Sequence, residues 1–109
     1  METPEQSGTG GSQVNINLQN VKKAALILRA LNHKLRQQIL DLIHNEKKIT
    51  VTEIYVRMRL EQSVASQHLA ILRKAGIVET LRDGKFIYYS VNLSRIDDIN
   101  RIVADLLIG

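Results

Sequence analysis

Short polar side chains recur at helical spacing in the stretch QSVASQHLAILRKA, residues 62–75. A helix repeats about every 3.6 residues, so Ser63, Ser66 and Gln67 share one face with the small Ala70. Hydroxyl and amide groups near the N-terminal end of a helix can hydrogen-bond base edges in the major groove of DNA. The alternative is an ordinary solvated face, although such faces are usually rich in charged residues. The spacing therefore predicts a helix face that reads base sequence.

Basic side chains form a second candidate group beside this face. Arg82 and Lys85 flank the tip of a predicted hairpin, where two cations suit DNA phosphates, although charged hairpin edges are also common on solvated surfaces. His68 borders the polar face and suits either a phosphate contact or a structural bond to the preceding turn. The predicted DNA-contacting residues are Gln62, Ser63, Ser66, Gln67, His68, Arg73, Lys74, Arg82 and Lys85.

The composition limits the class of protein. A chain of 109 residues, 44% of them hydrophobic, fits one domain with a small core. The net charge of +4 suggests an anionic partner such as nucleic acid. The chain has no Cys, which excludes disulfides, thiolate metal ligands and Cys nucleophiles. Because no signal-peptide pattern or long apolar run is present, we expect a cytoplasmic protein without a membrane partner.

Apolar periodicity predicts where the first helices begin and end. Residues 1–13 are rich in Gly, Ser and Thr and lack an apolar pattern, which predicts a disordered tail. We expect the remaining residues, 14–109, to form one domain. A helical repeat begins at Val14 and breaks near Asn32, and a second helix ends near Asn45.

The next two helices carry clear start and stop signals. Thr50 and Glu53 have the spacing of a capping box, which opens a third helix that ends near Arg59. After a tight connection, residues 62–75 form the fourth helix, and Gly76 stands where a left-handed terminating residue belongs.

The apolar period then changes from helical to alternating. This change predicts a β-hairpin over residues 77–91, with Asp83-Gly84 as a two-residue type I′ turn. Ser94 is the predicted N-cap of a last helix. The resulting order of four helices, a hairpin and a helix, with a short turn before the fourth helix, predicts a mainly α winged helix-turn-helix. The first and last helices are more apolar than one core requires, which suggests a second packing partner.

Three segments resemble the ArsR/SmtB family of bacterial winged-helix repressors, in the right order over about residues 28–91. LNHKLRQQIL resembles the family's opening motif, with Arg36 at the motif's Arg. LEQSVASQHLAILRKAGIVE resembles its recognition segment, and RDGKFIYYSV resembles its wing, with Gly84 and Tyr89 in place. The resemblance implies a homodimer formed by the first and last helices, a palindromic double-stranded DNA operator, and repression released by an effector that the sequence does not identify. The implied interface residues are Val14, Leu18, Val21, Ala25, Leu28, Ile99, Val103 and Leu106.

The sequence departs from the family pattern at three places. Glu61 replaces the usual Ser at the N-cap of the recognition helix, and Gln67 replaces a common Arg or His, which implies an altered base preference. The family's metal sites use Cys on the third helix, or Asp and His on the last helix. This chain has no Cys, and its last helix offers only Asp97, Asp98 and Asp105, which are weak ligands by themselves. We therefore expect no metal and no cofactor.

These observations favour a sequence-specific, homodimeric regulator of transcription that acts as a repressor. The alternative is a winged-helix module that binds a partner protein without specific DNA binding, which the acidic Glu61 and the missing effector ligands would suit. An enzyme is not expected, because no nucleophile–base pair, carboxylate pair or phosphate loop is present.

Overall fold

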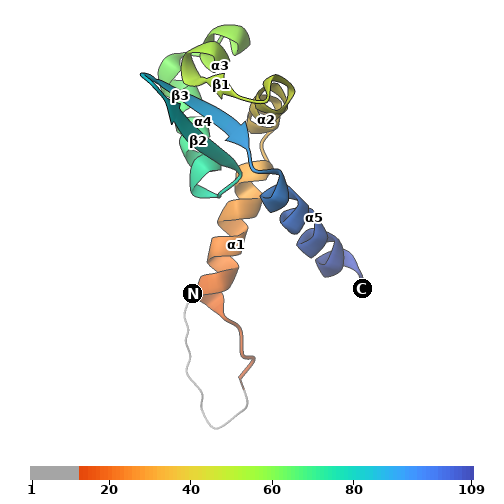
Figure 1. Cartoon of the computed structure of the whole chain (residues 1–109). Coiled ribbons are helices and arrows are strands. Elements are labelled where there is room, and N and C mark those ends of the chain that lie inside the picture. The colour runs from red at the N-terminus through yellow and green to blue at the C-terminus, as the bar shows by residue number, and fades with distance from the viewer. Residues whose placement is uncertain (1–12) are drawn as a thin grey trace.

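The computed structural model describes residues 13–109, and its helices and strands follow the predicted order (Figure 1). The predicted tail, residues 1–13, lies almost wholly outside the described part. The elements are α1 (Leu18–Leu31), α2 (Lys34–Glu46), β1 (Ile49–Thr50), α3 (Val51–Met58), α4 (Gln62–Lys74), β2 (Val78–Asp83), β3 (Phe86–Val91) and α5 (Leu93–Leu107). Helices α2 to α4 and the sheet form a body, from which α1 and α5 project and diverge (Figure 1).

The core lies where α2, α3 and α4 meet the inner face of the sheet. Its largest fully buried side chains are Ile39, Ile43, Ile49, Ile54, Leu69, Leu72, Ile77 and Val78. The outer ends of α1 and α5 lie outside this core. Only residues close to the body are buried, namely Ala30 of α1 and Ile99 of α5. The body is therefore a small single core that fixes the position of α4.

The sheet has three strands rather than the two that the sequence predicts. The strand order is β1-β3-β2, and both neighbouring pairs are antiparallel. Ile49 and Thr50 in β1 pair with Tyr89 and Tyr88 in β3. A strand of two residues carries too short an alternating pattern to be recognised in a sequence, because strand prediction depends on four or more alternating residues.

The hairpin turn lies one residue later than predicted. Asp83 pairs with Phe86, so the two loop residues are Gly84 and Lys85 instead of Asp83 and Gly84. Gly84 has a φ of +63°, whereas the φ of Lys85 is not positive. Positive φ at the first loop position alone is the pattern of a type II′ turn, which requires Gly there, so the type I′ prediction was wrong.

Helix α1 begins four residues after the predicted start at Val14. The side chain of Asn17 accepts a hydrogen bond from the Asn20 backbone N–H at 3.1 Å and caps the helix. Val14 therefore precedes the helix and is 83% exposed. The apolar repeat continues through residues that are not helical, because periodicity alone does not mark where a cap interrupts it.

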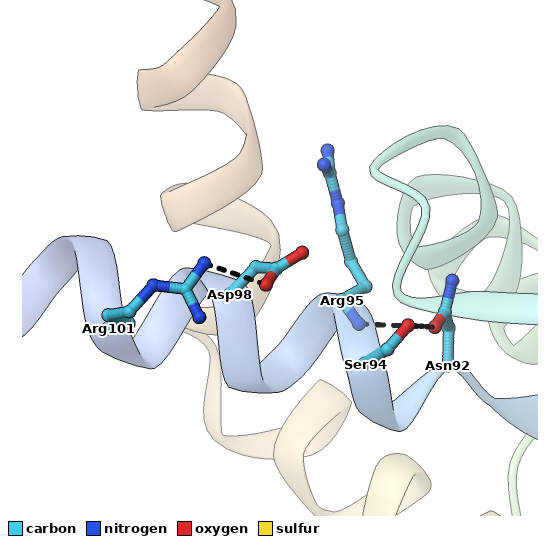
Figure 2. Close-up of polar contacts among 5 residues, drawn as sticks. All are labelled: Asn92, Ser94, Arg95, Asp98 and Arg101. Atoms are coloured by element: carbon cyan, nitrogen blue, oxygen red, sulfur yellow. Dashed lines mark hydrogen bonds and ion pairs between the residues drawn. The ribbon is translucent and has the colours of Figure 1, made fainter.

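Helix α5 also has a different cap from the predicted one. The side-chain oxygen of Asn92 accepts the backbone N–H of Arg95 at 3.1 Å and the hydroxyl of Ser94 at 2.9 Å (Figure 2). Ser94 therefore lies in the first turn and supports the cap, and Asn92 is the N-cap itself. Asn and Ser are about equally favourable as N-cap residues, so the sequence alone does not distinguish Asn92 from Ser94. The position at which the helical backbone begins decides between them.

The predicted capping box of α3 is confirmed. The Thr50 hydroxyl oxygen accepts the Glu53 backbone N–H at 3.3 Å, and a Glu53 carboxylate oxygen accepts the Thr50 backbone N–H at 3.1 Å. The backbone and side-chain hydrogen bonds from Thr50 hold the pKa of the Glu53 carboxyl below its usual value. The predicted end of the helix is also confirmed, because Arg59 caps it in the left-handed conformation, with φ 57°.

We expect Thr50→Ala to lower the free energy of unfolding by about 1 kcal/mol, because it removes the side-chain half of the capping box. Chemical denaturation of the purified protein measures this change. Thr52→Ala is the matched control, because Thr52 is exposed in the same turn and forms none of these bonds. Equal destabilisation by the two variants would contradict the capping role.

Candidate nucleic-acid interface

Helix α4 is held on one side by the core. Ala65, Leu69 and Leu72 are at most 1% exposed, and they follow the i, i+4, i+7 spacing of a buried helix face. The turn from Arg59 to Glu61 separates α4 from α3, so the two helices form a helix-turn-helix. The buried stripe fixes which face of α4 points outward.

The predicted base-reading residues lie on that outward face. Gln62, Ser63, Ser66 and Gln67 are all exposed, and they occupy the first two turns of α4. Arg73 and Lys74 are exposed at the opposite end of the same helix. The helix therefore presents uncharged polar groups at its N-terminal end and positive charge at its C-terminal end.

Arg82 and Lys85 lie at the outer end of the hairpin, and both are exposed. Arg82 is paired across the strands with Ile87, on the same face of the sheet as the core-packing Tyr89. The Lys85 ammonium lies over the Phe86 ring, 5.5 Å from its centroid. The two cations thus stand near the tip of a projecting hairpin, where a DNA backbone can approach them.

The N-terminus of α4 is occupied by Glu61, as expected. Glu61 is the N-cap residue, but its side chain forms no capping hydrogen bond. The first backbone N–H groups of α4 are therefore not satisfied by this side chain, and helix N-termini with open N–H groups suit phosphate oxygens. The exposed Glu61 carboxylate opposes such a contact by charge repulsion.

The sequence analysis placed Arg36 in the family's opening motif but did not predict its structural role. Arg36 is 7% exposed, and its Nε donates to the Ala30 carbonyl at 2.7 Å. One terminal nitrogen donates to the Arg29 carbonyl at 3.0 Å, and the other lies 3.3 Å from Nδ1 of His68. A signal was present, because Arg36 precedes the buried Ile39 by three residues and so interrupts an apolar helix face.

His68 is half-buried and joins α4 to α2 through this arginine. Because a guanidinium can only donate, Nδ1 of His68 accepts, which leaves Nε2 to carry the proton of the neutral ring. The His33 ring lies 5.0 Å away, centroid to centroid. Burial, followed by the charges of His33 and Arg36, lowers the pKa of His68 below its ordinary value. The structural bond of His68 is thus to α2, not to the preceding turn.

Arg95 of α5 makes a similar contact at the far end of α4. Its Nε donates to the Ala75 carbonyl at 3.2 Å, and its side chain points away from the axis of α5 (Figure 2). Gly76 follows with a φ of +76°, as the sequence predicts, and a Cβ atom there would lie 3.3 Å from Arg95 Nε. Both the backbone conformation and the arginine therefore favour glycine at this position.

The predicted interface residues separate into two groups. Leu18, Val21, Ala25 and Leu28 on α1 are exposed, as is Leu106 on α5. Ile99, however, is only 8% exposed and packs in the core of the same protomer, so it offers little surface to a second copy. Val103 is half-buried against that core. The large apolar side chains that α5 leaves most exposed are Ile102, Leu106 and Leu107.

Within the described residues, no three His, Asp or Glu side chains gather in a group that could hold a metal ion. Asp98 instead pairs with Arg101 at 2.9 Å, one turn further along α5 (Figure 2). In the same part of the chain, no helix is both long enough and apolar enough to cross a membrane.

Comparison with known proteins identifies the family. The model of the family described as "Bacterial regulatory protein, arsR family" matches residues 33–80. The transcriptional activator HlyU of Vibrio cholerae is 34% identical over 77 residues, which cover 71% of this chain and 70% of HlyU. The chain belongs to the arsR family. This arsR-family protein is therefore a winged helix-turn-helix, DNA-binding regulator of transcription.

Further relatives agree with this assignment. The transcriptional repressor PagR of Bacillus anthracis is 30% identical to the arsR-family chain over 88 residues, covering 81% of this chain and 88% of PagR. The homodimeric winged helix-turn-helix DNA-binding domain of Mb0332 from Mycobacterium bovis superposes with a TM-score of 0.66. That domain is 26% identical, and the match covers 91% of this chain and 94% of the domain. The predicted family and fold class are thus confirmed.

The lowered pKa of His68 predicts a stability that depends on pH. At pH values below 6.5, the ordinary pKa of histidine, His68 in the unfolded chain binds a proton. The folded protein binds this proton less readily, because its His68 has a lower pKa. We therefore expect the His68 contribution to the free energy of unfolding to be fully present near neutral pH. It should decline as the pH falls below 6.5 and level off beneath the folded-state pKa.

Denaturation between about pH 7.5 and pH 5.5 measures this slope. In His68→Gln, a neutral amide oxygen can still accept from Arg36, so the variant should lose the slope while it retains its fold. If the variant and the original protein lost stability equally over this range, His68 would not be the responsible group.

Proposed function

We propose that the protein regulates transcription as a homodimer that binds a palindromic operator, with helix α4 of each copy in the major groove. The observation that carries this proposal is the outward face of α4. Its uncharged polar groups occupy the N-terminal turns, while Ala65, Leu69 and Leu72 anchor the opposite face. An anchored helix with short polar groups at its leading end suits base reading.

Within this proposal, two classes of residue have different tasks. Ser63, Ser66 and Gln67 read base edges, and Gln67 can bond an adenine with both groups of its amide. The remaining candidates contact the backbone and carry affinity rather than specificity. These backbone contacts are Gln62, His68, Arg73, Lys74, Arg82 and Lys85. Because Arg36 engages Nδ1 of His68, only Nε2 of that ring is left for a phosphate.

A dimer would place two copies of α4 in successive major grooves, about 34 Å apart. The support for a dimer is the exposed apolar surface on the two projecting helices. Val21 of α1 is 54% exposed, and Ile102 and Leu106 of α5 are 61% and 74% exposed. Large apolar side chains in such number are costly on a monomer surface and are usually covered by a partner. The homodimeric Mb0332 domain has the same fold.

Repression is the direction of regulation that we propose, as the family resemblance implies. The relatives include both the activator HlyU and the repressor PagR, so a reporter gene downstream of the operator is the deciding assay. We further infer a cytoplasmic regulator without catalytic activity, whose single domain spans residues 14–109. No effector is assigned by these observations.

Gln67→Ala should reduce the discrimination between the preferred operator and its single-base variants by about tenfold or more, because a bidentate base contact is worth about 1–3 kcal/mol. Arg82→Ala should instead weaken binding to every sequence and make its dependence on salt less steep. Gel-shift titrations against the operator and random DNA at several salt concentrations measure both effects.

Gln38→Ala is the matched control for these titrations, because Gln38 is an exposed glutamine on α2 outside the proposed interface. If Gln67→Ala weakened binding to the operator and random DNA equally, the base-reading role would be wrong. If the original protein bound no genomic fragment at micromolar concentration, the alternative of a protein-interaction module would be favoured.

Leu106→Glu should shift the protein from dimer to monomer, because it places an unpaired charge in the proposed apolar interface. We expect the dimer dissociation constant to rise by about tenfold or more, as measured by sedimentation equilibrium. Leu81→Glu is the matched control, because Leu81 is 61% exposed on the sheet, away from α1 and α5. A strictly monomeric original protein at micromolar concentration would contradict the dimer.

A further inference from the structure

A hollow lies between α1 and the C-terminal half of α4, outside the surfaces already assigned to base reading and to dimerisation. It has a volume of about 560 Å³, which is within the range typical of small-molecule sites. Its lining residues are Lys23, Leu26, Ile27, Ile71, Lys74 and Ala75. Three of these residues come from α1, and three come from the end of α4 and its C-cap Ala75. Both sets have i, i+3 and i+4 spacing, so two adjacent helix turns face one another.

The walls of the hollow are apolar and incompletely covered. Leu26 is 57% exposed and Ile71 is 42% exposed, while Ile27 and Ala75 form the more buried side next to the core. Apolar side chains that remain open to water in a concave surface favour an apolar occupant.

The charge of the hollow is positive and uncompensated. Each helix supplies one lysine, Lys23 from α1 and Lys74 from α4. Neither helix contains an Asp or Glu, and neither lysine forms an ion pair within the described part of the chain. Two free ammonium groups beside an apolar wall are complementary to a ligand with one anionic end and one apolar end.

The hollow is distinct from the proposed dimer stripe of α1. Successive residues advance about 100° around a helix axis, so Leu26 lies about 100° from Ala25 and about 140° from Val21. A second copy that packs on Val21 and Ala25 would therefore approach a different side of α1. This geometry favours a small ligand over the second copy as the occupant.

We propose that the hollow is a binding site for an amphipathic anion, a carboxylate with an aliphatic body. The carboxylate lies between the ammonium groups of Lys23 and Lys74, and the aliphatic body covers Leu26 and Ile71.

The site would also provide regulation, and this consequence rests on the proposed function. Lys74 is assigned both to a DNA phosphate and to the ligand carboxylate, so the two anions compete for one ammonium group. Ligand binding therefore weakens DNA binding, and by linkage DNA weakens ligand binding by the same factor.

Titration calorimetry with decanoate as the probe tests the site in the full-length protein. Decanoate should bind with a stoichiometry of one per chain. Acetate, which lacks the apolar body, and decyltrimethylammonium, which reverses the charge, should not bind detectably. Phenylbutyrate, an aromatic carboxylate, tests whether the ligand is aliphatic or aromatic. Tighter binding of decanoate than of phenylbutyrate supports an aliphatic ligand. Equal binding of decanoate and decyltrimethylammonium, or tighter binding of phenylbutyrate, would overturn the proposal.

Two variants locate the site. Lys23→Glu and Leu26→Glu should each weaken decanoate binding by about tenfold or more, because each places a carboxylate in the hollow. Lys34→Glu is the matched control, since it changes the net charge equally at an exposed position on α2. Binding that is equal in all three variants would show that decanoate adheres nonspecifically. Loss of the dimer in Leu26→Glu, measured by sedimentation, would show that a second copy occupies the hollow.

The calorimetric result does not depend on DNA, so the two proposals can fail separately. If the protein binds no operator but binds decanoate at Lys23 and Leu26, only the regulatory function is lost. If it binds an operator but not decanoate, the ligand site is wrong. When both hold, decanoate should lower operator affinity in the original protein, and Lys23→Glu should reduce that effect.

Discussion

The hydrogen bonds of one buried arginine tie the projecting helix α1 to the body. A buried guanidinium is stable only when its N–H groups have partners, and Arg36 finds two of them in the Arg29 and Ala30 carbonyls. These carbonyls belong to the last turn of α1, where a helix leaves four acceptors unpaired. The Leu31 carbonyl accepts from Gln37, so the first turn of α2 satisfies most of the end of α1. A cation at a helix C-terminus is also favoured by the helix dipole.

An arginine also donates to a carbonyl at the C-terminal end of α4, where Arg95 of α5 donates to the Ala75 carbonyl. Three sets of contacts therefore hold α4 in place. Arg95 holds its C-terminal end, and Leu69 and Leu72 pack along its buried side. In its middle, His68 contacts Arg36. In its first two turns the core holds the side that carries Ala65, and the outward residues Gln62, Ser63, Ser66 and Gln67 stay exposed. The restrained and open parts of α4 thus coincide with the structural and DNA-reading parts of its sequence, because contacts to the body use the same face that the core buries.

The parts of this arrangement that depend on local sequence were predictable, and the parts that depend on contacts across the fold were not. The Thr50 capping box and the left-handed Gly76 are local, because residues within four positions determine them. The hairpin turn was misplaced by one residue, because strand pairing decided between two loops that both contain Gly84. The buried state of Ile99 depends on how α5 leaves the body, which its apolar repeat does not encode. The polar face of α4 was found because a buried stripe defines its opposite side.

Helix α1 takes part in three features of the molecule: the contact with the body, the exposed apolar stripe and the hollow beside α4. Arg36 fixes its C-terminal end to the body and, through His68, to α4. Its exposed stripe is available to a second copy, and its flank forms one wall of the hollow that Lys74 closes from α4. A rigid helix cannot tilt at one of these contacts without moving at the others, because its backbone hydrogen bonds keep its shape. A second copy that packs on the exposed stripe would therefore contact the same helix that forms one wall of the hollow.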